Sequence, residues 1–277
     1  IDAVAMSFVR SAKDIETVRN AIARLAPKKS WTPVISKLER PEALQNLEEI
    51  VKASDGVMVA RGDLGIECPM EELPIIQRRI VKRCQRFGKP VIVATHMLES
   101  MIENPMPTRA EITDVANAVY EQADAIMLSG ETTVGKYPVK CVEVFDRIAR
   151  RIERSGNAGY HERAELTSPR QKLVKSAVVM ADQLRAEAVI VFTRRGSMAR
   201  WTSWLRPRFS PIYAVCETWP LADSLALNWG ITPVVFAFDY NDPERNIDVA
   251  LAQMKAAGIL HRGHTVVIIS AMSSGEQ

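Results

Sequence analysis

A lysine and two carboxylates are spaced as phosphoryl or enolate chemistry would require. Lys37 and Glu39 lie two residues apart in an apolar segment, so in a β-strand both side chains would share one face. Asp63 ends the next apolar segment along the chain. Two carboxylates from neighbouring strand ends are the usual protein share of a Mg²⁺ site, and a nearby lysine stabilises charge on a transferring phosphoryl group or an enolate. Taken singly, each residue has a structural alternative, a Lys37–Glu39 ion pair or a helix cap at Asp63. Their joint occurrence at successive segment ends favours a site.

Other apolar segments end in polar residues in the same way. These residues are Ser7, Arg61, Gly62, Thr95, Ser129 and Glu131. A glycine such as Gly62 lets backbone N–H groups approach a ligand carboxylate closely. The hydroxyls and the acid are suited to anchoring a substrate or relaying a proton, although a hydroxyl at a strand end is often only a cap.

Five short apolar segments would position these side chains. They span residues 4–8, 34–39, 57–63, 91–95 and 125–131. Such segments are typical of buried parallel strands, and polar residues confined to their carboxyl ends are typical of a (β/α) barrel active site. Apolar residues at helical spacing predict the intervening helices at residues 11–25, 41–52, 71–87, 108–121 and 138–154.

A closed barrel of this type has eight strands, so five strands indicate part of a TIM barrel. The chain begins at Ile1, immediately before the first expected strand. The simplest interpretation is that three strands and their helices lie upstream, which makes residues 1–154 the later portion of a catalytic barrel domain.

Composition narrows the class of protein. The 277 residues are 47% hydrophobic and 25% charged, as in globular proteins. No apolar run approaches the roughly 20 residues needed to cross a bilayer, and no signal peptide is recognisable, so we expect a cytoplasmic protein without a membrane partner. The four cysteines lack paired or zinc-like spacing and fit a reducing compartment. A net charge of +3 is too small to indicate a nucleic-acid partner.

The second half predicts another domain. Residues 155–169 are rich in glycine and polar residues, which is typical of a linker. In residues 170–277, expected strands at 188–192, 212–216, 233–238 and 265–271 alternate with helices at 171–184, 197–205, 220–229 and 242–258. This alternation predicts a three-layer α/β domain with an open, mostly parallel sheet.

One turn of the second domain could bind an anion. It consists of Thr193, Arg194, Arg195, Gly196 and Ser197, and it follows a strand and opens a helix. Its hydroxyls, backbone N–H groups and arginines could hold the phosphate of an effector. Because the loop lacks the glycine pattern of a Rossmann or P-loop site, an ordinary turn with Ser197 as helix N-cap explains it equally well.

Several long motifs resemble those of pyruvate kinases. They are ISKLE, DGVMVARGDLGIE, KPVIVATHMLESMIENPMPTRAEITDVANAV and DAIMLSGETTVGKYP. The resemblance covers essentially all of residues 1–150, and the second half is similar to the family's regulatory-type C-terminal domain in element order and in FTRRGSMAR. It implies phosphoryl transfer from phosphoenolpyruvate to ADP, giving pyruvate and ATP, with Mg²⁺ or Mn²⁺ and commonly K⁺, whose ligands would lie outside this chain.

The resemblance also implies roles for single residues. Lys37 would stabilise the transferring phosphoryl group and the enolate oxygen, while Glu39 and Asp63 would hold the divalent metal. The substrate contacts would be Arg61, Gly62, Asp63 and Thr95, with Thr95 also counted among the catalytic residues.

Ser129 and Glu131 would belong to the proton-delivery network, and Arg109 would lie near a subunit contact of a homotetramer. Two positions depart from the family's pattern. His96 stands where glutamine is usual, which could alter the proton step. Met198 stands where a serine or threonine often contacts the effector phosphate, which leaves activation by a phosphorylated sugar or nucleotide open.

Two other functions remain compatible with the residues. A TIM-barrel lyase acting through a Mg²⁺-bound enolate would use the same two carboxylates, and a non-enzymatic module could bind phosphorylated metabolites at residues 193–197. On the pyruvate kinase interpretation, we expect the 277-residue chain to be inactive by itself.

Overall fold

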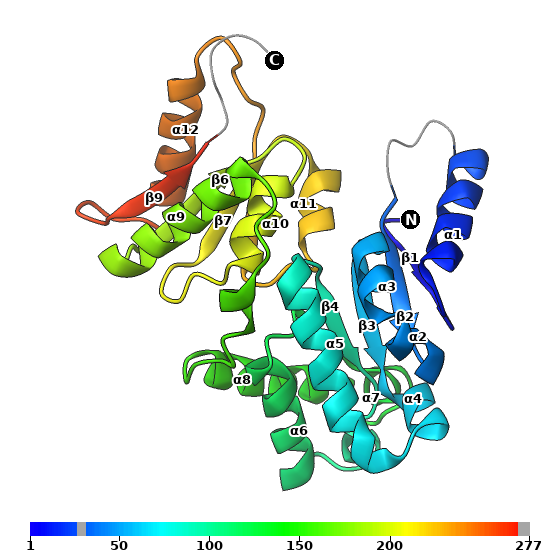
Figure 1. The fold of residues 1–277 in the computed structure, drawn as a ribbon. Helices are drawn as coiled ribbons and strands as arrows, with labels where there is room; N and C mark the ends of the chain where they lie inside the picture. Colours follow the sequence, from blue (N-terminus) through cyan, green and yellow to red (C-terminus); the bar gives the residue numbers. More distant parts are fainter. Residues whose placement is uncertain (27–31, 271–277) are drawn as a thin grey trace. The chain divides into compact units, whose positions relative to one another are not determined.

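The computed structural model describes residues 1–26 and 32–270, and the chain divides into two compact units, residues 1–165 and 166–277 (Figure 1). The boundary falls inside the segment expected as a linker. Residues 155–165 nevertheless pack with the first unit: Ala158 N–H donates to Tyr120 O at 2.8 Å, and Glu165 N–H donates to Arg86 O at 2.9 Å. Ala271, the last residue of the strand expected at 265–271, lies outside the described residues.

The first unit contains a five-stranded parallel sheet. Its strands are β1 (Val4–Met6), β2 (Val34–Leu38), β3 (Gly56–Ala60), β4 (Val91–Ala94) and β5 (Ala125–Met127), and they lie in this order across the sheet. The predicted parallel α/β arrangement is confirmed. Since all strands run the same way, their carboxyl ends meet at one edge of the sheet.

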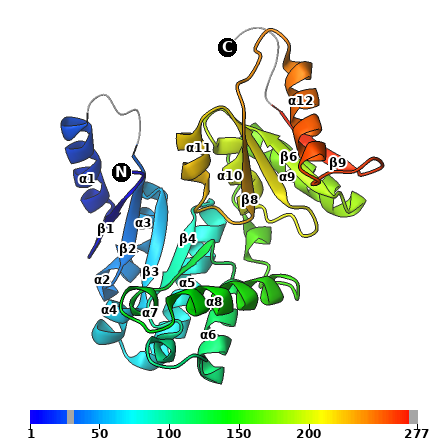
Figure 2. The same cartoon turned by 180° about the vertical axis from the view of Figure 1, so that it is seen from behind.

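Helices connect successive strands of this sheet, and three more follow its last strand, β5. They are α1 (Ala12–Leu25), α2 (Pro41–Gln45), α3 (Leu47–Ala53), α4 (Arg61–Glu67), η1 (Met70–Glu72), α5 (Leu73–Phe87), η2 (Glu99–Ile102), α6 (Arg109–Tyr120), α7 (Gly130–Thr133), α8 (Pro138–Glu153) and η3 (Tyr160–Arg163). Local signals set several ends. Thr108 accepts from Glu111 N–H in a capping box before α6, and Gly88 ends α5 in the left-handed conformation (φ 65°). Helices α6 and α8 pack side by side (Figure 2).

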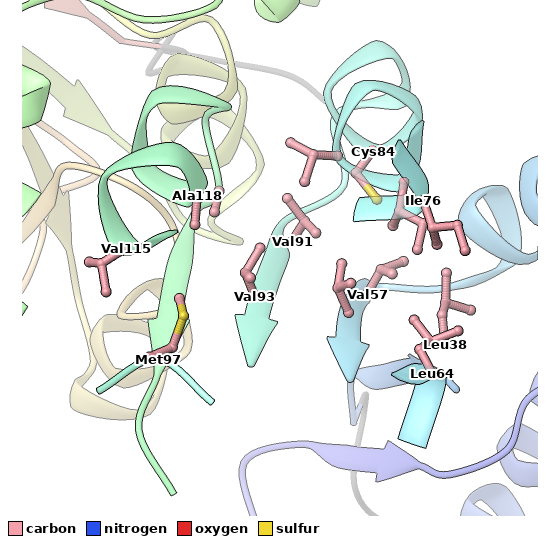
Figure 3. Close-up of a cluster of buried hydrophobic side chains, with 14 of the residues drawn as sticks. Leu38, Val57, Leu64, Ile76, Cys84, Val91, Val93, Met97, Val115 and Ala118 are labelled. Carbon is pink, nitrogen blue, oxygen red and sulfur yellow. The ribbon is translucent and has the colours of Figure 1, made fainter. Parts of the chain in front are cut away.

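The main core lies between the sheet and its helices (Figure 3). Val57, Val91 and Val93 point toward these helices, and Ile76 and Cys84 of α5 pack against the same cluster. Alternate strand residues point to the opposite face. That inner face holds a smaller cluster around Ile35, Met58, Ile92 and Ala94. Lys37 follows Ile35 by two residues and therefore belongs to the inner face.

The second unit has a four-stranded parallel sheet in the order β8 (Ile231–Val235), β7 (Ile212–Cys216), β6 (Ala188–Phe192), β9 (Val266–Ile269). Its helices are α9 (Pro169–Leu184), α10 (Ser197–Trp204), α11 (Trp219–Leu225) and α12 (Pro243–Ala256). Ala250 and Met254 of α12 share a cluster with Ile190 and Phe192. Helices α9 and α10 also pack against β6, where the alternate residues are buried as well, which gives the expected α/β layering.

The structure corrects several element boundaries. The helix expected at residues 220–229 ends at Leu225, and Gly130 and Glu131 belong to α7 and not to a strand. The helix expected at residues 41–52 is two helices, because Asn46 leaves helical geometry (φ −100°, ψ 18°) and its side chain donates to Arg10 O. Residues 61–63 do not extend a strand; they form the first turn of α4. Strand β8 ends at Val235, and Phe236 and Phe238 instead pack edge to face with each other beyond it.

Candidate active site at the carboxyl ends of the first sheet

Lys37 and Glu39 form a close pair at the end of β2. Lys37 Nζ lies 2.5 Å from Glu39 Oε1 and donates a hydrogen bond to Ser7 Oγ at 3.0 Å. Glu39 is fully buried, and its Oε2 accepts the backbone N–H of Phe8 at 2.7 Å. The chain enters the turn after β1 at Phe8 with φ 56°, so the loops after β1 and β2 meet at this carboxylate. The Lys37 side chain is 26% exposed, so it is not sealed from solvent.

The buried oxygen of Glu39 fits a cation. Glu39 Oε1 receives no hydrogen bond of acceptable geometry from the residues that the structure describes, although Lys37 is close to it. Asp63, in the first turn of α4 at the neighbouring strand end, is half-buried. Within residues 1–26 and 32–270, no group of three or more His, Cys, Asp and Glu side chains could hold a metal. Glu39 and Asp63 could offer two carboxylates, which would suit a Mg²⁺ ion that takes its other ligands from water and substrate.

Gly62 and Thr95 join the ends of β3 and β4. Gly62 N–H donates to Thr95 Oγ1 at 2.8 Å, and the Thr95 hydroxyl is 2.6 Å from Ala94 O. A Cβ at Gly62 would lie 3.6 Å from Thr95 Oγ1, 3.7 Å from His96 Cε1 and 3.8 Å from Thr95 Cβ, which are ordinary contacts. Neither a clash nor a positive φ requires a glycine here, which fits a position where a ligand approaches the backbone closely.

Arg61 lies beneath this loop and is engaged by protein acceptors. Its Nη2 donates to Thr95 O at 2.6 Å, and Nη1 pairs with both carboxylate oxygens of Asp114 at 2.7 Å. Nη1 also lies 3.4 Å from Gln77 Oε1. Thr95 and His96 both have positive φ, 70° and 52°, and Arg61 holds their carbonyls in this unusual conformation. Sequence reasoning missed Asp114 and Gln77, because a polar residue within a helix carries no signal of what it contacts.

Glu131 connects the loops after β4 and β5 through hydrogen bonds to both. It is 1% exposed; Oε1 accepts Leu98 N–H at 3.0 Å, and Oε2 accepts Ser129 N–H at 2.7 Å. The Ser129 carbonyl in turn caps α7 by accepting from Thr132 and Thr133. Ser129 stands at the strand end with the rest of the candidate site, whereas the Glu131 carboxylate is occupied by backbone donors. His96 is exposed at the loop surface, and Arg109 is exposed at the start of α6.

The turn at residues 193–197 has the geometry of a helix entry. Thr193 Oγ1 accepts Gly196 N–H at 2.9 Å, and Gly196 has φ 82°. The side chains of Arg194, Arg195 and Ser197 are exposed. Met198, the next residue along the chain, is buried in α10.

A groove adjoins this turn within the second unit. It has a volume of about 500 Å³ and is lined by Phe236, Ala237, Phe238, Asp239, Tyr240, Asn241, Arg245, Asn246 and Val249. The Arg194 guanidinium lies 5.7 Å from the centre of the Tyr240 ring, so the turn reaches the groove's edge. Basic and aromatic groups thus gather beyond the carboxyl ends of β6 and β8.

None of the four cysteines forms a disulfide. Cys84, Cys141 and Cys216 are buried, and burial raises the pKa of each thiol, so they pack as small apolar side chains. Among the described residues, no helix has the length and apolar character needed to pass through a bilayer.

The sequence of this chain matches two known protein-family descriptions. The family description "pyruvate kinase, barrel domain" matches residues 1–142, and "pyruvate kinase, alpha/beta domain" matches residues 171–277. The chain belongs to the pyruvate kinase family. It is 42% identical over 281 aligned positions to chloroplastic pyruvate kinase isozyme A of Ricinus communis, and 42% identical over 279 positions to a pyruvate kinase of Mycobacterium tuberculosis.

These alignments cover 98% and 99% of the chain but 48% and 57% of the two relatives. A crystal structure of a pyruvate kinase from Cryptosporidium parvum superposes with a TM-score of 0.92 at 34% identity, covering 98% of this chain and 57% of that one. The chain thus spans about half the length of the pyruvate kinases it matches. The similarity confirms the expected fold class and family resemblance.

Proposed function

We propose that the protein containing this chain transfers a phosphoryl group from phosphoenolpyruvate to ADP, yielding pyruvate and ATP. The observation that carries the proposal is the pairing of partly exposed Lys37 with buried Glu39 beside the Gly62–Thr95 hydrogen bond, at the meeting point of three strand ends. The Lys37 ammonium, and a metal ion held by the carboxylates, would match the negative charges of phosphoenolpyruvate. Family membership supports this activity.

Each residue would act on a different part of the substrate. The Lys37 ammonium would stabilise negative charge on the transferring phosphoryl group and then on the enolate oxygen. Arg61 would keep the loop in place, so that Gly62, Asp63 and Thr95 could bind the substrate carboxylate. Ser129 would take part in delivering the proton to the enolate carbon, with Glu131 holding the Ser129 loop in position.

Glu39 and Asp63 would hold a Mg²⁺ or Mn²⁺ ion. The ion would neutralise charge between the phosphate groups of the two substrates. Support comes from the fully buried Glu39 oxygen without a well-oriented donor. K⁺ dependence, with K⁺ ligands outside this chain, is part of the same proposal.

The proposal extends to assembly, location and regulation. We expect a cytoplasmic homotetramer with exposed Arg109 near a subunit contact. Residues 193–197 and the adjoining groove would bind a phosphorylated sugar or nucleotide effector. The exposed Arg194 and Arg195 supply the charge that such a phosphate needs, and Thr193 holds the turn in shape.

The test is a coupled assay for pyruvate and ATP on the native-length gene product, with phosphoenolpyruvate, ADP and Mg²⁺, in the presence and absence of K⁺. Lys37→Ala should lower kcat by at least about 100-fold. The matched control is Lys52→Ala, because Lys52 is an exposed lysine that pairs with Glu48 on α3, away from the site. A folded wild-type protein without turnover would favour a Mg²⁺-enolate lyase or a phosphometabolite-binding module instead. The 277-residue chain alone should show no turnover.

A further inference from the structure

The turn after β1 contacts both members of the Lys37–Glu39 pair. Strands β1 and β2 are parallel neighbours in which Met6 pairs with Ser36, so the residue that follows Met6 lies beside Lys37. That residue is Ser7, and its Oγ accepts a hydrogen bond from Lys37 Nζ at 3.0 Å. The register of the two strands therefore brings a hydroxyl to a lysine that lies 30 residues away in the sequence.

The next residue of this turn contacts the carboxylate. Phe8 N–H donates to Glu39 Oε2 at 2.7 Å, so a backbone donor occupies this oxygen. Phe8 has the left-handed conformation (φ 56°), and the Arg40 guanidinium lies 5.2 Å from the centre of its ring. A residue other than glycine keeps this conformation only where its surroundings fix it. One carboxylate oxygen is thus committed to the turn, and Oε1 is the oxygen that remains.

The Lys37 ammonium lies close to two oxygens, but the geometry of the two contacts differs. Nζ is 2.5 Å from Glu39 Oε1, which makes an ion pair. Among the residues that the structure describes, no donor meets Oε1 with hydrogen-bond geometry, whereas the contact from Nζ to Ser7 Oγ has that geometry. The aligned hydrogen bond of the ammonium is therefore the one to the serine.

A divalent cation and the lysine would compete for Glu39 Oε1. Two positive charges at contact distance from one buried oxygen would repel each other strongly. An ammonium that bonded fully to Oε1 would exclude a metal ion from it. Ser7 opposes this, because its hydroxyl offers the ammonium another acceptor, and hydrogen bonds from a charged donor are among the stronger ones.

We propose that Ser7 is a positioning residue for the Lys37 ammonium and keeps its hydrogen bond away from Glu39 Oε1, so that this oxygen can bind a divalent cation. The turn after β1 then prepares both groups, since Ser7 acts on the lysine and Phe8 N–H holds the other carboxylate oxygen. This role of Ser7 rests on the proposed function, because it concerns the metal that Glu39 and Asp63 would hold.

The test measures Mn²⁺ affinity of the native-length gene product, without substrate or nucleotide, from the electron paramagnetic resonance signal of the free ion. Glu39→Gln should abolish tight binding, which identifies the site. Ser7→Ala should weaken Mn²⁺ binding by about fivefold, because the ammonium then turns to Oε1. In a Lys37→Met background, Ser7→Ala should have no effect, since the group on which Ser7 acts is gone.

Two further variants separate positioning of the lysine from a general effect on the turn. Ser7→Thr keeps the hydroxyl and should bind Mn²⁺ as wild type does. Ser11→Ala removes another hydroxyl of the loop after β1, one that lies 3.4 Å from Asp14 Oδ2, and should leave the affinity unchanged. Ser7 is exposed, so its substitution should not prevent folding.

Three results would contradict the proposals at different points. Wild-type affinity in Ser7→Ala would overturn the role of Ser7, and so would an equal loss in the Lys37→Met background, which would mean that Ser7 contacts the ion itself. A folded wild-type protein that binds no Mn²⁺ would overturn the proposed metal site and the role of Ser7 with it. Because the measurement needs no turnover, an inactive enzyme with the expected Ser7 effect would refute only the proposed phosphoryl transfer.

Discussion

The backbone N–H of Gly62 donates a hydrogen bond of 2.8 Å to Thr95 Oγ1, which fixes the start of α4 against the end of β4. Thr95 makes this bond from a left-handed backbone conformation (φ 70°) that is unfavourable for a β-branched residue. The hydroxyl therefore holds the loop after β4 in a shape that the chain would not adopt by itself.

Thr95→Val should destabilise the first unit by about 1 kcal/mol, because valine has the same shape but cannot accept from Gly62. Exchange of the amides in β3 and β4, measured on the 277-residue chain, gives this free energy for the first unit alone. Thr95→Ser keeps the acceptor and should remain close to wild type. Equal losses in the two variants would mean that the methyl group, and not the hydrogen bond, stabilises the loop.

Gly62→Ala should change ligand binding without changing stability. The added methyl would meet protein atoms only at 3.6 Å or beyond, yet it would fill the space proposed for the substrate carboxylate. In the native-length enzyme, we expect KM for phosphoenolpyruvate to rise at least about tenfold, with an unchanged melting temperature. An unchanged KM would remove Gly62 from the proposed substrate contacts.

Gly196→Ala should show the opposite pattern. This glycine has φ 82°, and a Cβ would lie 2.7 Å from Arg200 Nη1 and 3.2 Å from Leu221 Cδ1. We expect a loss of about 1 to 2 kcal/mol in the second unit, measurable by the fluorescence of nearby Trp201 and Trp204 during urea unfolding. A variant as stable as wild type would show that the turn can relax, and would weaken the case for a preformed phosphate loop.

Much of the first sheet could be predicted because its strands are short and almost wholly apolar. Val57–Ala60 and Val91–Ala94 are buried on both faces, so their ends could be read from the first polar residue that follows. The same reasoning wrongly assigned Arg61 and Asp63 to the end of a strand, because no turn residue in the sequence separates them from the apolar segment. In the structure α4 starts directly after Ala60, and the guanidinium of Arg61 points beneath the loop after β4.

The partners of the site residues could not be predicted for a different reason. Asp114 lies 53 residues from Arg61, and Gln77 lies 44 residues from Glu121, and neither pairing leaves a periodic signal. The Lys37–Glu39 contact could be foreseen because two residues of one strand share a face. Contacts within an element follow from local geometry, whereas contacts between helices depend on how the whole unit packs.

Glu111 should govern part of the stability in acid. Burial would raise the pKa of its carboxyl, but hydrogen bonds from Ser100 and Thr108, four in all at 2.6–2.9 Å, favour the charged form and hold the pKa below its ordinary value of 4.5. A lowered folded-state pKa adds stability that is present above pH 4.5 and is lost as the pH falls through the folded-state value. Glu111→Gln should therefore flatten the decline in stability below pH 4.5, followed by circular dichroism across a pH series. If stability declines below pH 4.5 as steeply in Glu111→Gln as in wild type, other carboxyl groups cause most of that decline.

Asp124 should be a main stabiliser of the edge of the sheet opposite the site. Its carboxylate accepts Val91 N–H at 2.9 Å while its own N–H donates to Val91 O at 2.8 Å, so the aspartate closes the start of the β4–β5 ladder. Asp55 makes the same reciprocal pair with Val34 at the start of β2 and β3. Asp124→Ala leaves the Val91 N–H without this acceptor and should cost about 1 to 3 kcal/mol. Asp146→Ala is the control, because the partner of Asp146 among the described residues is Arg150, in an exposed pair on α8, and its loss should leave the melting temperature almost unchanged. If the two variants melt alike, the reciprocal pair contributes no more than a surface ion pair, and the stability of this edge must come from the apolar strand residues alone.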